Sequence, residues 1–125
     1  MKSSPRSDEV LLRHMLECLD NIDADTGRDR ARFFGSRMVR DAVLRNLQTL
    51  TESSQRLGDA IKAAEPAIPW RQLSATRNIL VHDYLGGIDP DAAWEIIDHD
   101  LPDLRAALER MLARPDSGVP GEEGP

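Results

Sequence analysis

The sequence feature that most constrains the fold is a long apolar repeat in the first half of the chain. Its members are separated alternately by four and three residues, with the polar Ser54 filling one position of the series: Val43, Leu47, Leu50, Leu57 and Ile61. This spacing places the side chains on one face of an α-helix, and Ser36 is a suitable N-cap for it. We therefore expect a helix of about 25 residues, which would span a small domain as the central rod of a bundle or as a subunit contact.

Two further apolar series predict the first and last helices. The first follows Ser7, an expected N-cap, and should end near Ile22 before a polar connection at residues 23–27: its members are Leu11, Leu12, Met15, Leu16, Leu19 and Ile22. The last series follows Asp89-Pro90, which is a strong helix start: its members are Trp94, Ile97, Leu101, Leu104, Leu108 and Met111. Pro102 interrupts this series, so we expect a kink or a split into two helices.

Proline and glycine mark the helix ends in the middle of the chain. Pro66 and Pro69 should end the long helix, because proline lacks the amide hydrogen that a helix interior requires. Trp70 then opens a third helix, and the pair Gly86-Gly87 provides its stop signal.

The fold class follows from these patterns. No stretch shows the two-residue alternation of a strand, so we predict an all-α, up-and-down bundle of four to five helices over residues 1–113. Residues 114–125 are rich in Pro, Gly, Asp and Glu. Such a segment cannot bury enough apolar surface to offset its chain entropy, and we expect a disordered acidic tail.

Charge is distributed unevenly along the chain. The net charge is −6, which argues at first against a nucleic-acid partner. Residues 28–46, however, carry six basic and two acidic side chains, whereas residues 83–125 carry three basic and eleven acidic ones. The middle of the chain is therefore basic, and a local positive surface is compatible with the acidic total.

Other compositional features concern location and metal binding. The N-terminus lacks a signal peptide's hydrophobic stretch, and the chain has no apolar run of about 20 residues, so we expect a cytoplasmic protein without a membrane partner. Cys18 is the only cysteine, which excludes an internal disulfide and a cysteine-built zinc site. His14 and His99 are expected at the surface, because neither has a second histidine at ligand spacing.

One segment concentrates functional chemistry. Arg77, Asn78, His82, Asp83 and Tyr84 fall within eight residues. The guanidinium suits a phosphate, and the imidazole can transfer a proton at neutral pH. No carboxylate cluster suggests hydrolysis by two metal ions, so the ribose 2′-hydroxyl of RNA is the natural nucleophile.

The same motif residues also have an ordinary structural interpretation. In that interpretation Arg77 pairs with an acidic residue of a neighbouring helix, His82 caps a helix, and Tyr84 packs against a helix end. The residues alone do not separate the two interpretations.

The motif and its flanks resemble the HepT family of HEPN-domain proteins. The resemblance covers roughly residues 8–113 and rests on the following positions: Arg45-Asn46-Leu47, Glu52, Ile68-Pro69-Trp70, Arg77-Asn78, His82-Asp83-Tyr84, Trp94, Asp100-Leu101-Pro102 and Leu104. It implies a four- to five-helix bundle that forms a homodimer or higher oligomer with two motif copies at a shared cleft. It also implies the toxin of a toxin–antitoxin pair, acting as a ribonuclease on RNA without a metal or other cofactor.

The resemblance assigns a role to each motif residue. Arg77 would orient the scissile phosphate, His82 would act in acid–base chemistry, and Asn78 would support both. Tyr84 would receive AMP from the partner antitoxin, a minimal nucleotidyltransferase, and this modification would silence the toxin. Asp83 departs from the family pattern, in which a small residue is frequent, and its carboxylate would raise the pKa of the His82 imidazole or weaken RNA binding.

A second functional class fits the same residues. In a non-catalytic module, the pocket would hold a nucleotide or serve only to dock the nucleotidyltransferase. The acidic balance of the chain favours this alternative, and the arginines of residues 28–46 favour the ribonuclease.

Overall fold

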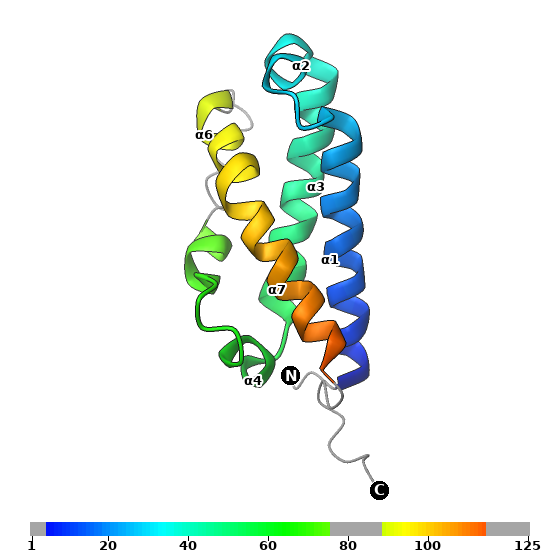
Figure 1. Ribbon diagram of the computed structural model, residues 1–125, viewed down its shortest axis with the longest axis vertical. Helices are drawn as coiled ribbons and strands as arrows, with labels where there is room; N and C mark the ends of the chain where they lie inside the picture. The colour runs from blue at the N-terminus through cyan, green and yellow to red at the C-terminus, as the bar shows by residue number, and fades with distance from the viewer. Residues whose placement is uncertain (1–4, 76–88, 115–125) are drawn as a thin grey trace, which may run out of the picture.

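The structure is a helical bundle built around two long antiparallel helices (Figure 1). It is a computed structural model that describes residues 5–75 and 89–114. All regular secondary structure in these residues is helical, which confirms the predicted fold class: α1 (Pro5–Thr26), α2 (Arg30–Gly35), α3 (Arg37–Arg56), α4 (Asp59–Ala63), helical residues 70–75, α6 (Pro90–Glu95), the π-helical segment η1 (Ile96–Asp100) and α7 (Leu101–Ala113). In these ranges no helix is long and apolar enough to cross a membrane.

The core lies between α1, α3 and α7. The predicted apolar series supply it, and its most deeply buried side chains include Met15, Ile22, Leu50, Leu108 and Met111. Cys18 is buried in the same core, where burial, with a smaller effect from Glu17, raises the pKa of its thiol. The thiol therefore stays neutral, and Cys18 acts as a small apolar core residue.

Helix α1 is longer than predicted at both ends. It begins at Pro5, so the prediction of Ser7 as the N-cap is wrong; proline is well tolerated at a first helical position. It continues through Thr26, so the polar connection predicted at residues 23–27 is mostly one more helical turn. Thr26 is fully buried, and its hydroxyl donates to the Ile22 carbonyl at 2.8 Å. The polar composition of this turn reflects its exposed side, because Asp23 is only half-buried.

Helix α3 is shorter than the predicted 25 residues. Ser36 is its N-cap, as predicted, and the hydroxyl accepts a hydrogen bond from the Val39 amide at 3.2 Å. The helix ends at Arg56, and the chain then becomes extended at Leu57 and Gly58. The apolar spacing continues across this break because Leu57 is buried at the C-cap and Ile61 packs against the core from α4.

Asp8 explains how the break after α3 is stabilised. Its carboxylate reaches across from α1 and accepts a hydrogen bond from the Gly58 amide at 3.1 Å. A buried amide hydrogen outside a helix needs such a partner. Asp8, in the first turn of α1, therefore stabilises the start of α4.

The C-terminal helices confirm two predicted signals. Asp89 is the N-cap of α6 and accepts a hydrogen bond from the Asp91 amide at 3.0 Å, with Pro90 at the first helical position. Pro102 follows the π-helical segment, in which the Leu101 amide bonds to the Ile96 carbonyl five residues earlier. The helix break predicted at Pro102 is thus a π-helical turn, in which the helix widens locally before α7 begins.

Candidate functional site

The described chain ends on both sides of the predicted motif. Arg77, Asn78, His82, Asp83 and Tyr84 lie within residues 76–88, outside the described residues. The structure describes how the chain is held before and after this segment. Residues 70–75 and α6 lie on the same side of the α1–α3 pair (Figure 1).

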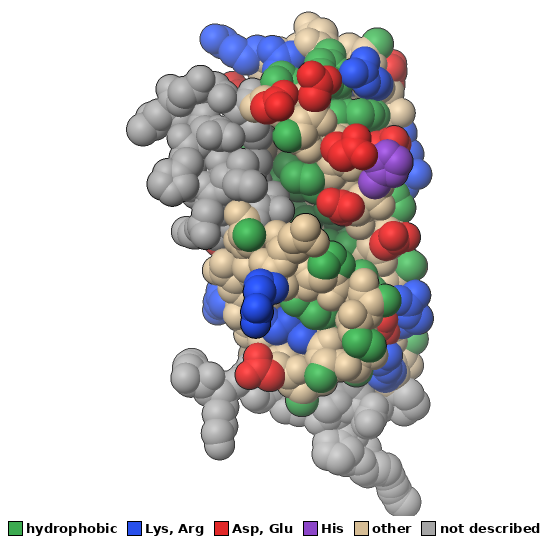
Figure 2. Space-filling view, turned by 90° about the vertical axis from the view of Figure 1, so that its left-hand side faces the viewer, with side chains coloured by type: hydrophobic (Ala, Val, Ile, Leu, Met, Phe, Trp, Pro, Cys, Tyr) green, Lys and Arg blue, Asp and Glu red, His purple; other side chains and the backbone are tan. Residues whose placement is uncertain are grey.

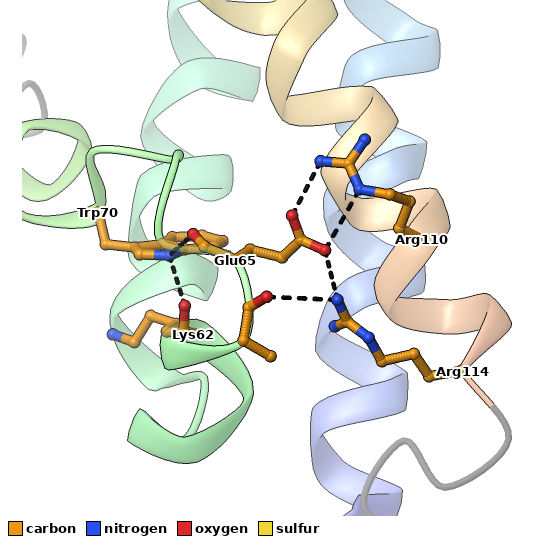
Figure 3. A network of polar contacts seen from close by, with 6 residues as sticks. Lys62, Glu65, Trp70, Arg110 and Arg114 are labelled. Atoms are coloured by element: carbon orange, nitrogen blue, oxygen red, sulfur yellow. Dashed lines mark hydrogen bonds and ion pairs between the residues drawn. The ribbon is translucent and has the colours of Figure 1, made fainter.

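Trp70 anchors the chain just before the motif. It begins the helical residues 70–75, as predicted from the prolines that precede it. Its indole Nε1 donates to the backbone carbonyls of Lys62 at 3.0 Å and Glu65 at 3.2 Å (Figure 3). One side chain thereby ties the motif-bearing segment to the end of α4 and to the connection after it.

Glu65 joins this anchor to the C-terminal helix. Arg110 donates to both Glu65 carboxylate oxygens at 2.8 and 3.3 Å, and Arg114 donates to one of them at 2.7 Å (Figure 3). Arg114 also reaches the Ala64 carbonyl at 3.3 Å. The Glu65 side chain is only 6% exposed, whereas that of Arg110 is 55% exposed. A nearly buried carboxylate is therefore satisfied by two guanidinium groups, of which that of Arg110 belongs to a largely exposed side chain.

The ion-pair network controls the protonation of Glu65. The hydrogen bond from Arg110 lowers the pKa of the carboxyl, and Arg114 acts in the same direction, whereas burial opposes both. The hydrogen bond that Arg110 donates to Glu65 in turn raises the pKa of Arg110. No local pattern in the sequence indicates the role of Glu65, since its partners lie about 45 residues later in the chain.

A second anchor holds the chain just after the motif. The Trp94 ring of α6 packs against Phe33 of α2 with a centroid distance of 5.4 Å. Arg30 and Asp91 form an ion pair of 3.4 Å between the same two helices, and the Arg30 guanidinium lies 4.3 Å from the centre of the Phe34 ring. The first turn of α6 is thus fixed against α2 at one end of the bundle.

The surface of α6 and η1 is acidic. Figure 2 shows acidic side chains gathered with a histidine on the upper part of this face. The exposed acidic residues of these elements are Asp91, Glu95, Asp98 and Asp100. His99 is exposed as predicted, 3.2 Å from Glu95 and 3.7 Å from Asp98. Over residues 5–75 and 89–114, no group of three or more His, Cys, Asp or Glu is placed to hold a metal ion.

Several residues flanking the motif have structural roles. Leu47, Leu101 and Leu104 are buried in the core. The Asn46 side-chain oxygen accepts a hydrogen bond from the Asn21 amide at 3.1 Å, which links α3 to α1, and the Asn46 amide donates to the Ala42 carbonyl at 3.0 Å. These positions explain part of the family resemblance through packing rather than chemistry.

Two concave regions occur in the described part of the protein. A cavity of about 50 Å³ between α1 and the η1–α7 region is lined by Trp94, Asp98 and Arg105, among others. It is too small for a nucleotide, because ligand sites usually enclose about 300 Å³ or more. An open groove of about 500 Å³ between α1 and α3 includes Arg6, His14 and Arg56. This groove lies at the opposite end of the bundle from α2 and α6.

The described chain forms an all-α bundle. In the sequence, the candidate catalytic motif lies between two anchored helical parts, residues 70–75 and α6. The family model of the HepT-like ribonucleases matches residues 15–111. A candidate RNase of Methanocaldococcus jannaschii is 32% identical over 107 residues, which cover 85% of this chain and 97% of that protein. A probable ribonuclease HepT of Thermococcus cleftensis is 30% identical over 79 residues, covering 63% of this chain and 71% of that protein. No solved structure matches significantly.

The chain therefore belongs to the HepT-like ribonuclease family. This confirms the resemblance found from the motif and its flanks. The matched region extends through the segment that carries Arg77 to Tyr84.

Proposed function

We propose that this protein is the toxin of a toxin–antitoxin pair and cleaves RNA as a metal-independent endoribonuclease. The observation that carries the proposal is the family match over residues 15–111, which spans the complete Arg77–Tyr84 motif. The names of the relatives, a candidate RNase and a probable ribonuclease, support the same reaction class.

The motif residues can account for the chemistry of cleavage. The ribose 2′-oxygen attacks the adjacent phosphorus and loses its proton to a base, while the bond from phosphorus to the 5′-oxygen breaks. The 5′-oxygen takes a proton from an acid, and the other product ends in a 2′,3′-cyclic phosphate. His82 supplies proton transfer, Arg77 binds the phosphate oxygens as charge develops, and Asn78 orients them.

Cleavage needs a base and an acid, and one motif contains a single histidine. We therefore propose a homodimer in which the motifs of two copies face a shared cleft. His82 of one copy then acts as the base and the second copy's histidine as the acid.

Growth arrest tests this function. Expression of the parent without its antitoxin should stop growth, whereas Arg77→Ala and His82→Ala should each restore it, because each removes a group that acts in the transition state. His99→Ala is the matched control, since His99 is an exposed histidine of η1, and it should remain toxic. Continued toxicity of both motif variants would contradict the catalytic assignment.

Tyr84 is the proposed site of control. Transfer of AMP from ATP to the Tyr84 oxygen by a minimal nucleotidyltransferase would release pyrophosphate and leave a negatively charged phosphodiester. This charge would repel an RNA phosphate and could pair with Arg77.

Intact mass after co-expression with the nucleotidyltransferase tests the modification. The parent should gain the mass of one or more AMP groups, and Tyr84→Phe should gain none. A Tyr84→Phe protein that is still modified would refute the site.

A non-catalytic nucleotide-binding or docking subunit of a nucleotidyltransferase complex is the second candidate. The exposed acidic residues of α6 and η1 favour it, because negative charge beside the end of the motif segment opposes RNA binding. This candidate predicts a stable complex with the nucleotidyltransferase and no growth arrest by the parent.

A further inference from the structure

An arginine-rich region occupies the end of the bundle formed by α2 and the start of α3. Three of its arginines have partners. Arg28 lies 3.5 Å from Asp23, Arg30 pairs with Asp91, and Arg40 donates to the carbonyls of Phe33 and Phe34 at the end of α2. These three guanidinium groups thus already make polar contacts within the fold.

Arg32 and Arg37 differ from these three arginines. Both are exposed, and no ion pair within the described ranges involves either. Arg32 is held close to the α1–α2 turn, since a Cβ added at Gly27 would lie 2.7 Å from its Nη1. Next to Arg37, Met38 is 79% exposed, which is unusual for a large apolar residue. We refer to Arg32, Arg37 and Met38 as the arginine end.

We propose that the arginine end binds the backbone and a base of single-stranded RNA outside the Arg77–Tyr84 motif. This proposal rests on the proposed function for its choice of RNA as the ligand. Guanidinium groups offer paired hydrogen-bond donors that match phosphate oxygens. Met38 adds an adaptable apolar surface on which a base or ribose can pack.

The position of the arginine end supports this role. The Arg30–Asp91 ion pair and the Phe33–Trp94 contact fix α2 against the first turn of α6. Asp89, at the start of α6, is where the described chain resumes after the motif segment. An RNA bound at the arginine end therefore lies on the part of the bundle into which the motif segment leads.

Charge favours RNA over a protein partner at this surface. The chain carries a net charge of −6, and much of its acidity lies on α6, on η1 and after them. A nucleic acid must therefore contact a local region of positive charge, and residues 28–46 contain six basic against two acidic side chains. The two acidic residues of this range, Asp29 at the N-cap of α2 and Asp41 on α3, are both exposed.

Equilibrium binding of a labelled single-stranded RNA tests the phosphate contacts. The full chain carrying His82→Ala serves as the background, so that the RNA stays intact. Arg32→Gln with Arg37→Gln should weaken binding about tenfold or more at low salt. The same pair should reduce the slope of log affinity against log salt by about 1.4, which corresponds to two phosphate contacts on a single strand.

Arg13→Gln with Arg56→Gln is the matched control. It removes the same two charges, and both residues are exposed in the half of the bundle away from α2. Circular dichroism checks that both double variants keep the parent's helix content. The control should bind RNA with the affinity and salt slope of the background protein.

A second pair of variants tests the apolar contact. Met38→Ala should weaken RNA binding about threefold without changing the salt slope, since it removes no charge. Val10→Ala is its control, because Val10 is 62% exposed but lies on α1. It should have no effect.

The inference is overturned if the arginine-end pair keeps the parent's salt slope, or if the control pair loses as much affinity. A change of oligomeric state without a change in RNA affinity would also overturn it, by identifying a protein contact. If the parent cleaves RNA but the Arg32→Gln, Arg37→Gln variant binds RNA as its background does, the inference is refuted and the proposed nuclease is not. RNA binding that depends on the arginine end, without cleavage by the parent, refutes the proposed nuclease alone.

Discussion

Glu65 holds the start of the motif-bearing segment because two arginines of the last helix converge on its carboxylate. The Arg110 and Arg114 contacts of 2.8 and 2.7 Å are charge-assisted, and the acceptor side chain is 6% exposed. Trp70 bonds to the backbone of the same residue. Glu65 is thus a positioning residue for the segment that follows.

Substituting Glu65→Gln should lower the free energy of unfolding by about 1–2 kcal/mol, because one of the two carboxylate oxygens becomes an NH2 group, which cannot accept a hydrogen bond from Arg110 or Arg114. Urea unfolding measures the difference. Glu109→Gln is the control, since Glu109 is an exposed carboxylate next to Arg110, and it should change stability little. Equal losses in both variants would contradict the assigned role of Glu65.

The pH dependence of stability gives a second test of the same network. The Arg110 hydrogen bond holds the pKa of Glu65 below its ordinary value of 4.5, which the carboxyl regains on unfolding. The contribution is therefore fully present above about pH 4.5 and is lost as pH falls through the lower folded pKa. The stability difference between parent and Glu65→Gln should be full at about pH 7 and shrink at about pH 3. A difference independent of pH would contradict the ionic mechanism.

Residue roles could be predicted from sequence where their partners are local. The caps Ser36 and Asp89 bond to amides two or three residues away, and both predictions are confirmed. Asp8 bonds to an amide 50 residues away, and Glu65 bonds to arginines more than 40 residues away. Such long-range pairs depend on packing, so no local pattern indicates them.

The turn between α1 and α2 is specified by two consecutive residues in the left-handed region. Gly27 has φ 61° and Arg28 has φ 57°. The Arg28 amide donates to the buried Thr26 hydroxyl at 3.1 Å, which links the turn to the end of α1. Glycine suits the first position because it adopts this φ without a Cβ clash.

Replacing Gly27→Ala should destabilise the protein by about 1 kcal/mol or more, owing to the positive φ and to the close approach of Arg32 Nη1 to the new Cβ. Thermal unfolding measures the effect. Gly35→Ala is the matched control, since nothing lies within 4 Å of a Cβ at that position. A Gly27→Ala protein as stable as the control would refute the strained turn.

Apolar periodicity predicted the long helices but neither their ends nor the short helices α2 and α4. Each of the three series lies on a buried helix face. Ser54, the polar position in the series from Val43 to Ile61, is also buried, and its hydroxyl donates to the Thr51 carbonyl at 2.7 Å. Leu57 lies at the C-cap of α3 and Ile61 lies in α4, yet both follow the spacing of the series because both face the same core. A spacing rule cannot detect such a break when the core continues across it.

At the scale of the whole molecule, two anchors from distant parts of the chain fix the described chain on either side of the motif segment. Glu65 and Trp70 hold the chain before it, and the contact of α6 with α2 holds the chain after it. The catalytic roles of Arg77 and His82 and the modification of Tyr84 stay predictions from sequence and family, because these residues lie outside the described ranges.

If two copies of the chain share one catalytic cleft, RNA cleavage must depend on their association. Light scattering should show a dimer or larger oligomer at micromolar concentration, and cleavage per chain should fall when dilution populates the monomer. Constant activity per chain across a dilution series that yields the monomer would contradict the shared site.

The sharpest test of a metal-independent ribonuclease is cleavage of RNA by the purified protein in the presence of a chelator. The parent should cut RNA and leave a 2′,3′-cyclic phosphate, as should His99→Ala, whose substitution lies in η1. Arg77→Ala and His82→Ala should each lose roughly 100-fold or more in rate. Cleavage that requires an added metal, or that persists in both motif variants, would contradict the assignment of this protein as a metal-independent ribonuclease acting through Arg77 and His82.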